Sequence, residues 1–224
     1  SLDASVPDAP VLTVVNAIPF GSATLYLKGE MNEWGGNLEG FDFAYADNNY
    51  TLITTVPAGL HQFKIADADW NDAATLGAVA GDEAIVAGEA KTLTLLDEAN
   101  LTFEFAADTL YRINVDATDK SAPVLSVDVH VPFAARTMYL KGEMNDWGGE
   151  LEGFAFTYAA SGIFTLDTTL AAGPYNFKIA DVDWADDSTV GAATGDGTVV
   201  LGEGKTLVLP GDDNLFIEVS EEKS

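Results

Sequence analysis

The chain has 224 residues, 47% of them hydrophobic, and a formal net charge of −26 from 36 acidic and 10 basic side chains. Such an acidic surface repels phosphate backbones and anionic lipid, which argues against nucleic acid and membranes as partners. The apolar share is too high for a disordered acidic tail. Because the sequence contains no cysteine, disulfides, thiolate catalysis and cysteine-ligated metals are excluded.

Much of the sequence occurs twice. "KGEMNEWGG" (residues 28–36) returns as "KGEMNDWGG" (141–149), and two longer stretches return in the same order. These are "APVLTVVNAIPF" (9–20) with "APVLSVDVHVPF" (122–133), and "AGLHQFKIADADW" (58–70) with "AGPYNFKIADVDW" (172–184). A copy of about 100 residues is large enough for one hydrophobic core. The repeat therefore predicts two modules, 10–116 and 124–220, joined by a polar linker, 117–123.

Short runs of β-branched and aromatic residues follow one another along the first copy with a period of two. They are "TLYLKG" (24–29), "FDFAY" (41–45), "YTLITTV" (50–56), "HQFKIA" (61–66), "KTLTLL" (91–96), "LTFEF" (101–105) and "LYRINV" (110–115). Turns rich in Gly, Asn, Asp and Pro separate them, and no helical period is sustained. The pattern predicts an all-β chain of two tandem immunoglobulin-like antiparallel β-sandwich modules.

The second copy ends early. "NLFIEV" (214–219) matches either "NLTFEF" (100–105) with a final strand lost, or "TLYRINV" (109–115) with a hairpin deleted. The sequence leaves both alternatives open.

The four tryptophans occupy paired positions, Trp34 with Trp147 and Trp70 with Trp184. A tryptophan in a β-sandwich usually packs in the core. Here, however, Trp34 precedes two glycines in a turn, and Trp70 lies among Asp and Asn residues of a loop. These contexts favour a contact surface built from two loops.

A lysine recurs six residues before the second tryptophan of each copy. In "HQFKIA" the alternation directs Phe63 and Ile65 to the core and Lys64 outward, and Lys178 repeats this between Phe177 and Ile179. A surface lysine is ordinarily only solvated. With two indole rings nearby, it suits a sugar, whose C–H face stacks on indole while Lys and Asn bond the hydroxyls.

"YLKGEMNEWGG" followed by "VPAGLHQFKIADADW" resembles the starch- and glycogen-binding modules of amylases and pullulanases, and the glycogen-binding module of the AMP-activated kinase β subunit. The resemblance implies non-catalytic binding of an α-1,4-glucan, starch, glycogen or maltooligosaccharides. It assigns the stacking rings, the lysine and a loop-ordering asparagine to Trp34, Trp70, Lys64 and Asn32, and to Trp147, Trp184, Lys178 and Asn145. Met31 and Met144 replace the usual aromatic, and Leu76 and Val190 are weak additional candidates because the segment after the second tryptophan departs from the pattern.

The same resemblance implies a place in a larger secreted or cell-surface bacterial protein, with a covalently attached catalytic domain. No cofactor or metal is expected. The rival reading is an acidic, calcium-stiffened spacer or protein-interaction arm, because "DADWND" and "DVDWADD" cluster carboxylates. "GEGKT" (202–206) lacks the first glycine of a phosphate-binding loop and is interpreted as a hairpin turn.

Overall fold

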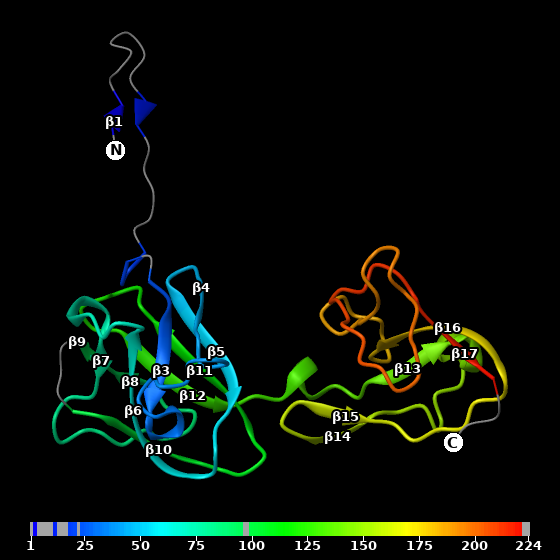
Figure 1. The fold of residues 1–224 in the computed structure, drawn as a ribbon, viewed down its shortest axis with the longest axis horizontal. Helices are drawn as coiled ribbons and strands as arrows, with labels where there is room; N and C mark the ends of the chain where they lie inside the picture. Colours follow the sequence, from blue (N-terminus) through cyan, green and yellow to red (C-terminus); the bar gives the residue numbers. More distant parts are fainter. Residues whose placement is uncertain (1, 4–10, 13–17, 22, 96–98, 221–224) are drawn as a thin grey trace. The chain divides into compact units, whose positions relative to one another are not determined.

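The computed structural model describes residues 2–3, 11–12, 18–21, 23–95 and 99–220. The chain divides into two compact units, Ser1–His130 and Val131–Ser224 (Figure 1). Within these described residues, every pair of named strands is antiparallel, and the helices are short 3-10 helices. The prediction of an all-β fold is therefore confirmed. None of the described helices has the length and apolar character that crossing a lipid bilayer requires.

The described residues of the first unit form two five-stranded sheets. One has the order β10-β6-β7-β9 with β3 beside β6, and the other has the order β4-β5-β11-β12-β8. The strands of the first sheet are β3 (Leu25–Gly29), β6 (Gly59–Asp67), β7 (Leu76–Gly77), β9 (Thr94–Leu95) and β10 (Leu101–Phe105). Those of the second are β4 (Ala44–Ala46), β5 (Asn49–Thr55), β8 (Lys91–Thr92), β11 (Leu110–Asp116) and β12 (Val124–Val129). Two 3-10 helices, η1 (Glu30–Asn32) and η2 (Asp72–Ala74), and a short β1 (Leu2–Asp3)–β2 (Val11–Leu12) pair complete the unit.

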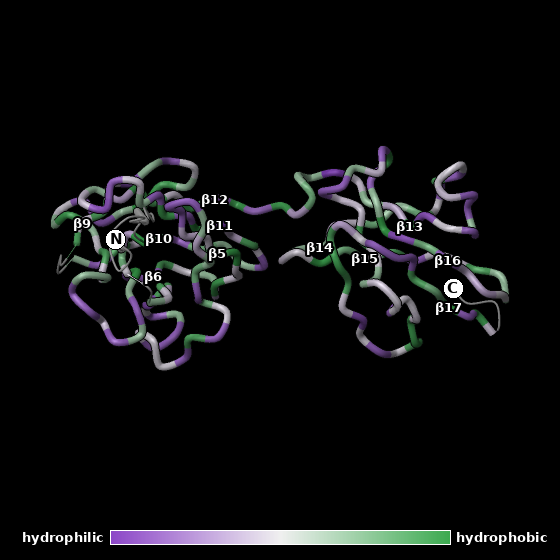
Figure 2. The backbone as a smooth tube through the Cα atoms, turned by 90° about the horizontal axis from the view of Figure 1, so that it is seen from above, coloured by the Kyte–Doolittle hydropathy of each residue, from purple (hydrophilic) through white to green (hydrophobic). Residues whose placement is uncertain are grey.

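Alternation along the strands forms the core between these sheets. In Figure 2 the backbone changes between hydrophobic and hydrophilic over short intervals along the strands. In β11, Tyr111, Ile113 and Val115 are buried while Arg112 is exposed. They join the inward side chains of β3, β6 and β10 in one cluster. A period of two thus gives each sheet one apolar face, and the two faces pack together.

The described residues of the second unit form fewer strands than those of the first. A three-stranded sheet contains β13 (Tyr139–Gly142), β16 (Gly173–Ala180) and β17 (Leu215–Val219), and a two-stranded sheet contains β14 (Thr157–Ala160) and β15 (Ile163–Thr165). Its 3-10 helices are η3 (Pro132–Ala135) and η4 (Glu143–Gly148). β17 pairs with β16 from Gly173↔Val219 to Phe177↔Leu215, which is the register of β10 on β6. "NLFIEV" is therefore the counterpart of "NLTFEF", and this settles the question that the sequence left open.

The boundary between the units differs from the predicted one. β12, placed by the repeat at the start of the second module, pairs with β11 from Tyr111↔Val129 to Asp116↔Val124. The predicted linker, 117–123, is the turn of this hairpin, and the carbonyl of its Pro123 accepts a hydrogen bond from the Leu93 N–H (2.7 Å). A sequence repeat records common ancestry, whereas strand pairing decides which unit a segment completes. Of the repeated stretch 9–20, residues 9–10 and 13–17 lie outside the described residues.

Candidate functional site: two tryptophan pairs over buried lysines

The repeated nonapeptide forms a tight loop at the end of β3. At Gly29 a Cβ atom would lie 2.4 Å from the Gln62 carbonyl oxygen, so only glycine allows β3 to approach β6 this closely. Asn32 then fixes the turn, because its Oδ1 accepts from the Gly29 N–H (2.9 Å) and its Nδ2 donates to the Leu27 carbonyl (2.7 Å). With 3% of its surface exposed, Asn32 orders the loop from inside, and Asn145 makes the matching bonds in the second unit.

All four tryptophans have left-handed backbone conformations. Their φ angles are +57° at Trp34, +59° at Trp70, +54° at Trp147 and +60° at Trp184. A left-handed residue with a Cβ costs roughly 1–2 kcal/mol. Strained residues persist where the surrounding structure holds them, and they cluster at functional sites. Because all four tryptophans adopt this conformation at paired positions, the strained backbone is a common feature of these loops in both units.

The second loop of the first unit is held by an aspartate. Asp67, at the end of β6, is buried, and its Oδ1 accepts from the Asn71 N–H (2.8 Å) while its Oδ2 accepts from Asn71 Nδ2 (2.6 Å). Burial by itself would raise the pKa of Asp67. The bonds from Asn71 and Asp69, together with the charge of Lys28, outweigh it and lower the pKa below its ordinary value. The ionised carboxylate therefore fixes the loop that carries Trp70.

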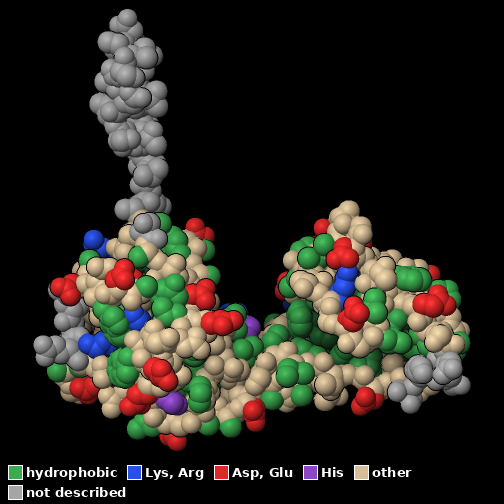
Figure 3. Space-filling model, viewed as in Figure 1, with side chains coloured by type: hydrophobic (Ala, Val, Ile, Leu, Met, Phe, Trp, Pro, Cys, Tyr) green, Lys and Arg blue, Asp and Glu red, His purple; other side chains and the backbone are tan. Residues whose placement is uncertain are grey.

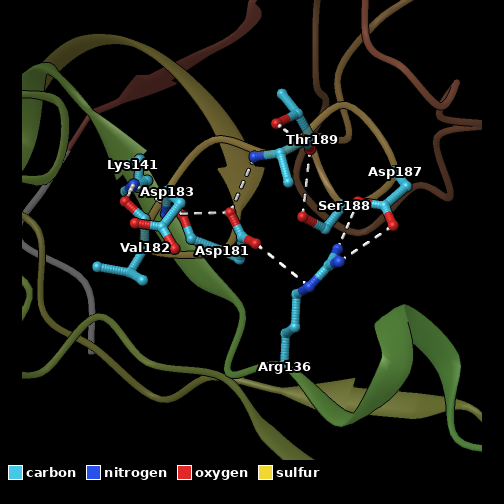
Figure 4. A network of polar contacts seen from close by, with 9 residues as sticks. Arg136, Lys141, Asp181, Val182, Asp183, Asp187, Ser188 and Thr189 are labelled. Atoms are coloured by element: carbon cyan, nitrogen blue, oxygen red, sulfur yellow. Dashed lines mark hydrogen bonds and ion pairs between the residues drawn. The ribbon is translucent and has the colours of Figure 1, made fainter.

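In the second unit the corresponding aspartate, Asp181, keeps the backbone donors but has a different side-chain partner. Position 71 corresponds to Ala185, which has no amide side chain, and Arg136 takes over part of the role with its Nε 3.6 Å from Asp181 Oδ2 (Figure 4). Arg136 also bonds Asp187 on the same loop. Backbone N–H groups of Asp183 and Ala185 donate to Asp181 Oδ1. The two loops therefore share their backbone hydrogen bonds to the aspartate, and only the side-chain partner differs, Asn71 in one unit and Arg136 in the other.

The two loops bring the tryptophans of each unit together. The ring centroids of Trp34 and Trp70 are 6.3 Å apart, with 34° between the ring planes. Trp147 and Trp184 repeat this arrangement at 6.3 Å and 36°. The rings are partly exposed, with Trp70 the most open at 37%. The structure thus brings the two tryptophans of each unit together as a tilted, partly exposed ring pair.

A lysine missed by the sequence analysis lies beneath each pair. Lys28 on β3 is 1% exposed, and its Nζ donates to the carbonyls of Asp67 (2.9 Å) and Ala68 (2.8 Å) and lies 4.2 Å from the Trp70 ring centroid. Burial lowers the pKa of Lys28, and the charges of Asp67 and Asp69 oppose that change. Lys141 makes the same bonds to Asp181 and Val182 and lies 4.3 Å from the Trp184 centroid.

The first glycine after each tryptophan leaves room for the side chain of the buried lysine. A Cβ at Gly35 would lie 2.3 Å from Lys28 Cε, and the residue has a φ of +99°. Glycine is therefore required for the loop to cross directly over the lysine stem. Gly148 stands in the same relation to Lys141, at 2.6 Å and +100°. The repeated motif is thus one unit in which the lysine, the glycines, the asparagine and the tryptophan depend on one another.

The predicted lysines lie opposite the buried ones. Lys64 pairs with Lys28 across β6 and β3, and Lys178 pairs with Lys141. Like charges directly opposite on neighbouring strands are unfavourable, and yet this lysine pair occurs in both units. Lys178 Nζ donates to the carbonyls of Gly211 (2.7 Å) and Asp212 (3.4 Å). Lys178 therefore holds the loop that contains Gly211 and Asp212.

The weaker candidates after the second tryptophan do not belong to the site. Leu76 on β7 is fully buried in the core of the first unit, where no external ligand reaches it. Val190 lies among apolar side chains of the second unit. Within the described residues, no group of three or more His, Asp or Glu is placed to hold a metal ion.

We expect the loops of the second tryptophans to loosen in acid. Because the pKa values of Asp67 and Asp181 are lowered by folding, their contribution is complete above the ordinary value of about 3.9 and is lost as the pH falls through the folded values. Tryptophan fluorescence of the folded protein should change below about pH 4. The Asp67→Asn/Asp181→Asn double variant should lack this change, whereas the exposed control Glu39→Gln should retain it. An unaltered transition in the double variant would contradict this prediction.

Comparison with known proteins gives limited matches. No protein-family model matches the chain, and no curated protein matches it. Among solved structures, SusF from Bacteroides thetaiotaomicron is similar with a TM-score of 0.39 and 17% identity, over 93% of this chain and 50% of that one. A pullulanase from Bacillus acidopullulyticus is similar with a TM-score of 0.24 and 13% identity, over 80% of this chain and 30% of that one. The chain thus spans half the length of SusF and less of the pullulanase, and similarity of this degree carries no argument about function.

Proposed function

We propose that each unit binds α-1,4-glucans, such as starch, glycogen or maltooligosaccharides, between its two tryptophans. The observation that carries the proposal is the recurrence of one tilted ring pair, over a buried lysine, in both units. Partly exposed indoles stack on the C–H faces of glucose rings. Two planes inclined by 34° suit a curved chain better than a flat cellulose ribbon.

The polar groups beside the rings complete the proposed site. Lys64 and Lys178 are partly exposed on the strands that lead to Trp70 and Trp184, where an ammonium can donate to sugar hydroxyls. Asn32, Asn145 and the buried lysines act indirectly by holding the rings. In this proposal the chain binds without catalysis and anchors a larger secreted or cell-surface amylolytic protein, with its covalently attached catalytic domain, to polysaccharide.

The test uses the fact that the chain has only four tryptophans. The Trp147→Gly/Trp184→Gly variant leaves Trp34 and Trp70 as the sole indoles, so its fluorescence reports on the first site alone. Glycine is chosen because it accepts the left-handed backbone at these positions. Maltoheptaose should change the fluorescence of this variant in a saturable manner, and Trp34→Gly added to it should weaken binding about 30-fold or more.

The controls separate sugar binding from the rival calcium-dependent spacer. Retention on insoluble starch should be unaffected by a chelator, and a cellulose gel should retain none of the protein. A folded variant that gives no fluorescence response at millimolar maltoheptaose would refute the proposal. A melting temperature that falls sharply with chelator, in a protein that does not bind starch, would favour the spacer.

A further inference from the structure

The second unit has an apolar groove that its own described residues do not cover. Its volume is about 180 Å³, and in Figure 3 the hollow on this unit is lined by hydrophobic side chains. The lining residues are Phe133, Met138, Phe156, Phe164, Ile179, Val190 and Leu207. Because none of these side chains can bond a hydroxyl, the groove is unsuited to a sugar and separate in character from the tryptophan site.

Each lining residue has a buried counterpart in the first unit. In the order above, these are Phe20, Leu25, Phe43, Tyr50, Ile65, Leu76 and Leu93, all within the core cluster. What buries them includes the β11–β12 hairpin, whose Ile113, Val115 and Leu125 belong to the same cluster. The described residues of the second unit contain no counterpart of this hairpin. The groove is therefore the space that β11 and β12 fill in the first unit.

The edges of the groove offer the hydrogen bonds that such a hairpin needs. In the first unit β5 pairs with β11 along its length, from Asn49↔Asp116 to Thr55↔Leu110. Its counterpart β15 pairs with β14 on one side, and within the described residues no strand occupies the other. Likewise the Gly88 and Leu93 N–H groups donate to the carbonyls of Val127 and Pro123 in the hairpin. In the second unit the corresponding donors are those of Gly202 and Leu207.

We propose that the groove of the second unit is an acceptor site for a β-hairpin of the β11–β12 type. The occupant is a pair of antiparallel strands with large apolar side chains at alternate positions, like the hairpin formed by residues 110–129. It adds to β15 through backbone hydrogen bonds and inserts its apolar side chains into the groove, the general mode of β-strand addition.

The test is titration of the full chain into a fluorescein-labelled peptide of residues 106–130, followed by fluorescence anisotropy. Saturable binding with one peptide per chain is expected. A peptide carrying Ile113→Asp and Val115→Asp should bind at least about 100-fold more weakly, because two buried apolar contacts are lost. A peptide carrying Arg112→Gln and Asp116→Asn, exposed positions on β11, should bind within about twofold of the parent.

Hydrogen exchange locates the bound peptide. Amides of residues 163–165, 202 and 207 should become protected, and binding of an apolar dye to the groove should fall in parallel. Protection of residues 49–55 instead would mean that the peptide replaces the hairpin of the first unit, and this would overturn the proposal. Absence of binding, equal binding of the aspartate peptide, or dimers of the chain that the peptide does not dissociate would overturn it as well.

Discussion

Replacing Lys28 by methionine is expected to lower the free energy of unfolding of the first unit by about 2–4 kcal/mol and to abolish sugar binding there. The substitution removes the two hydrogen bonds that the buried ammonium donates to the carbonyls of Asp67 and Ala68. It also removes the cation beneath the Trp70 ring. The gain from no longer burying a charge offsets part of this loss. Because both tryptophan loops depend on the lysine, the rings should no longer hold their spacing.

Lys64→Met is the matched control, since it removes a partly exposed lysine directly across the sheet. Its cost in stability should be about 1 kcal/mol or less, while maltoheptaose binding weakens. Urea denaturation followed by circular dichroism, together with the fluorescence titration, measures both effects. Lys141→Met should reproduce the result of Lys28→Met in the second unit. Equal costs for Lys28→Met and Lys64→Met would show that the buried lysine does not support the loops.

The position of the tryptophans was accessible from the sequence because local chemistry determines it. Neighbouring glycines place Trp34 in a turn, and neighbouring acids place Trp70 in a loop. The buried lysine was not accessible, because alternation puts Lys28 on the same outer face of β3 as Tyr26. What buries it is the fold of both loops over that face, a tertiary arrangement that strand periodicity does not encode. The close approach at Gly35, which requires glycine, is visible only after that burial is known.

The extent of each unit was likewise beyond the sequence pattern. Residues 124–129 alternate in the same way whichever sheet they join, so their pattern predicts a strand but not its partner. Two things decide the pairing: a short turn connects these residues to β11, and their apolar side chains cover a face of the core that would otherwise be exposed. The position of "NLFIEV" was ambiguous for a related reason, and the register of β17 on β16 resolves it. Local signals thus predict elements and loops, whereas module boundaries depend on which faces remain uncovered.

Two sites on one chain should act together on a polymer. The connection between β12 and β13 consists of residues 130–138, and a chain of this length spans at most about 30–32 Å. A short tether gives the second binding event an effective concentration in the millimolar range where both sites can reach one polysaccharide. For weak single sites, avidity then raises retention on starch by about 10²-fold without any new contact.

We therefore expect the Trp147→Gly/Trp184→Gly variant to lose about 10²-fold in retention on starch granules while the first site keeps its affinity for maltotriose. The short sugar reaches one site at a time and cannot report avidity, which makes it the internal control. The reciprocal Trp34→Gly/Trp70→Gly variant should behave alike, because the two ring pairs share their geometry. Adsorption isotherms on granules and calorimetry with maltotriose measure the two quantities. Calorimetry should give two sites per chain in the parent protein and one in either variant. A single site in the parent protein would mean that only one unit binds. Retention on granules would then be lost only in the variant that lacks the tryptophans of that unit.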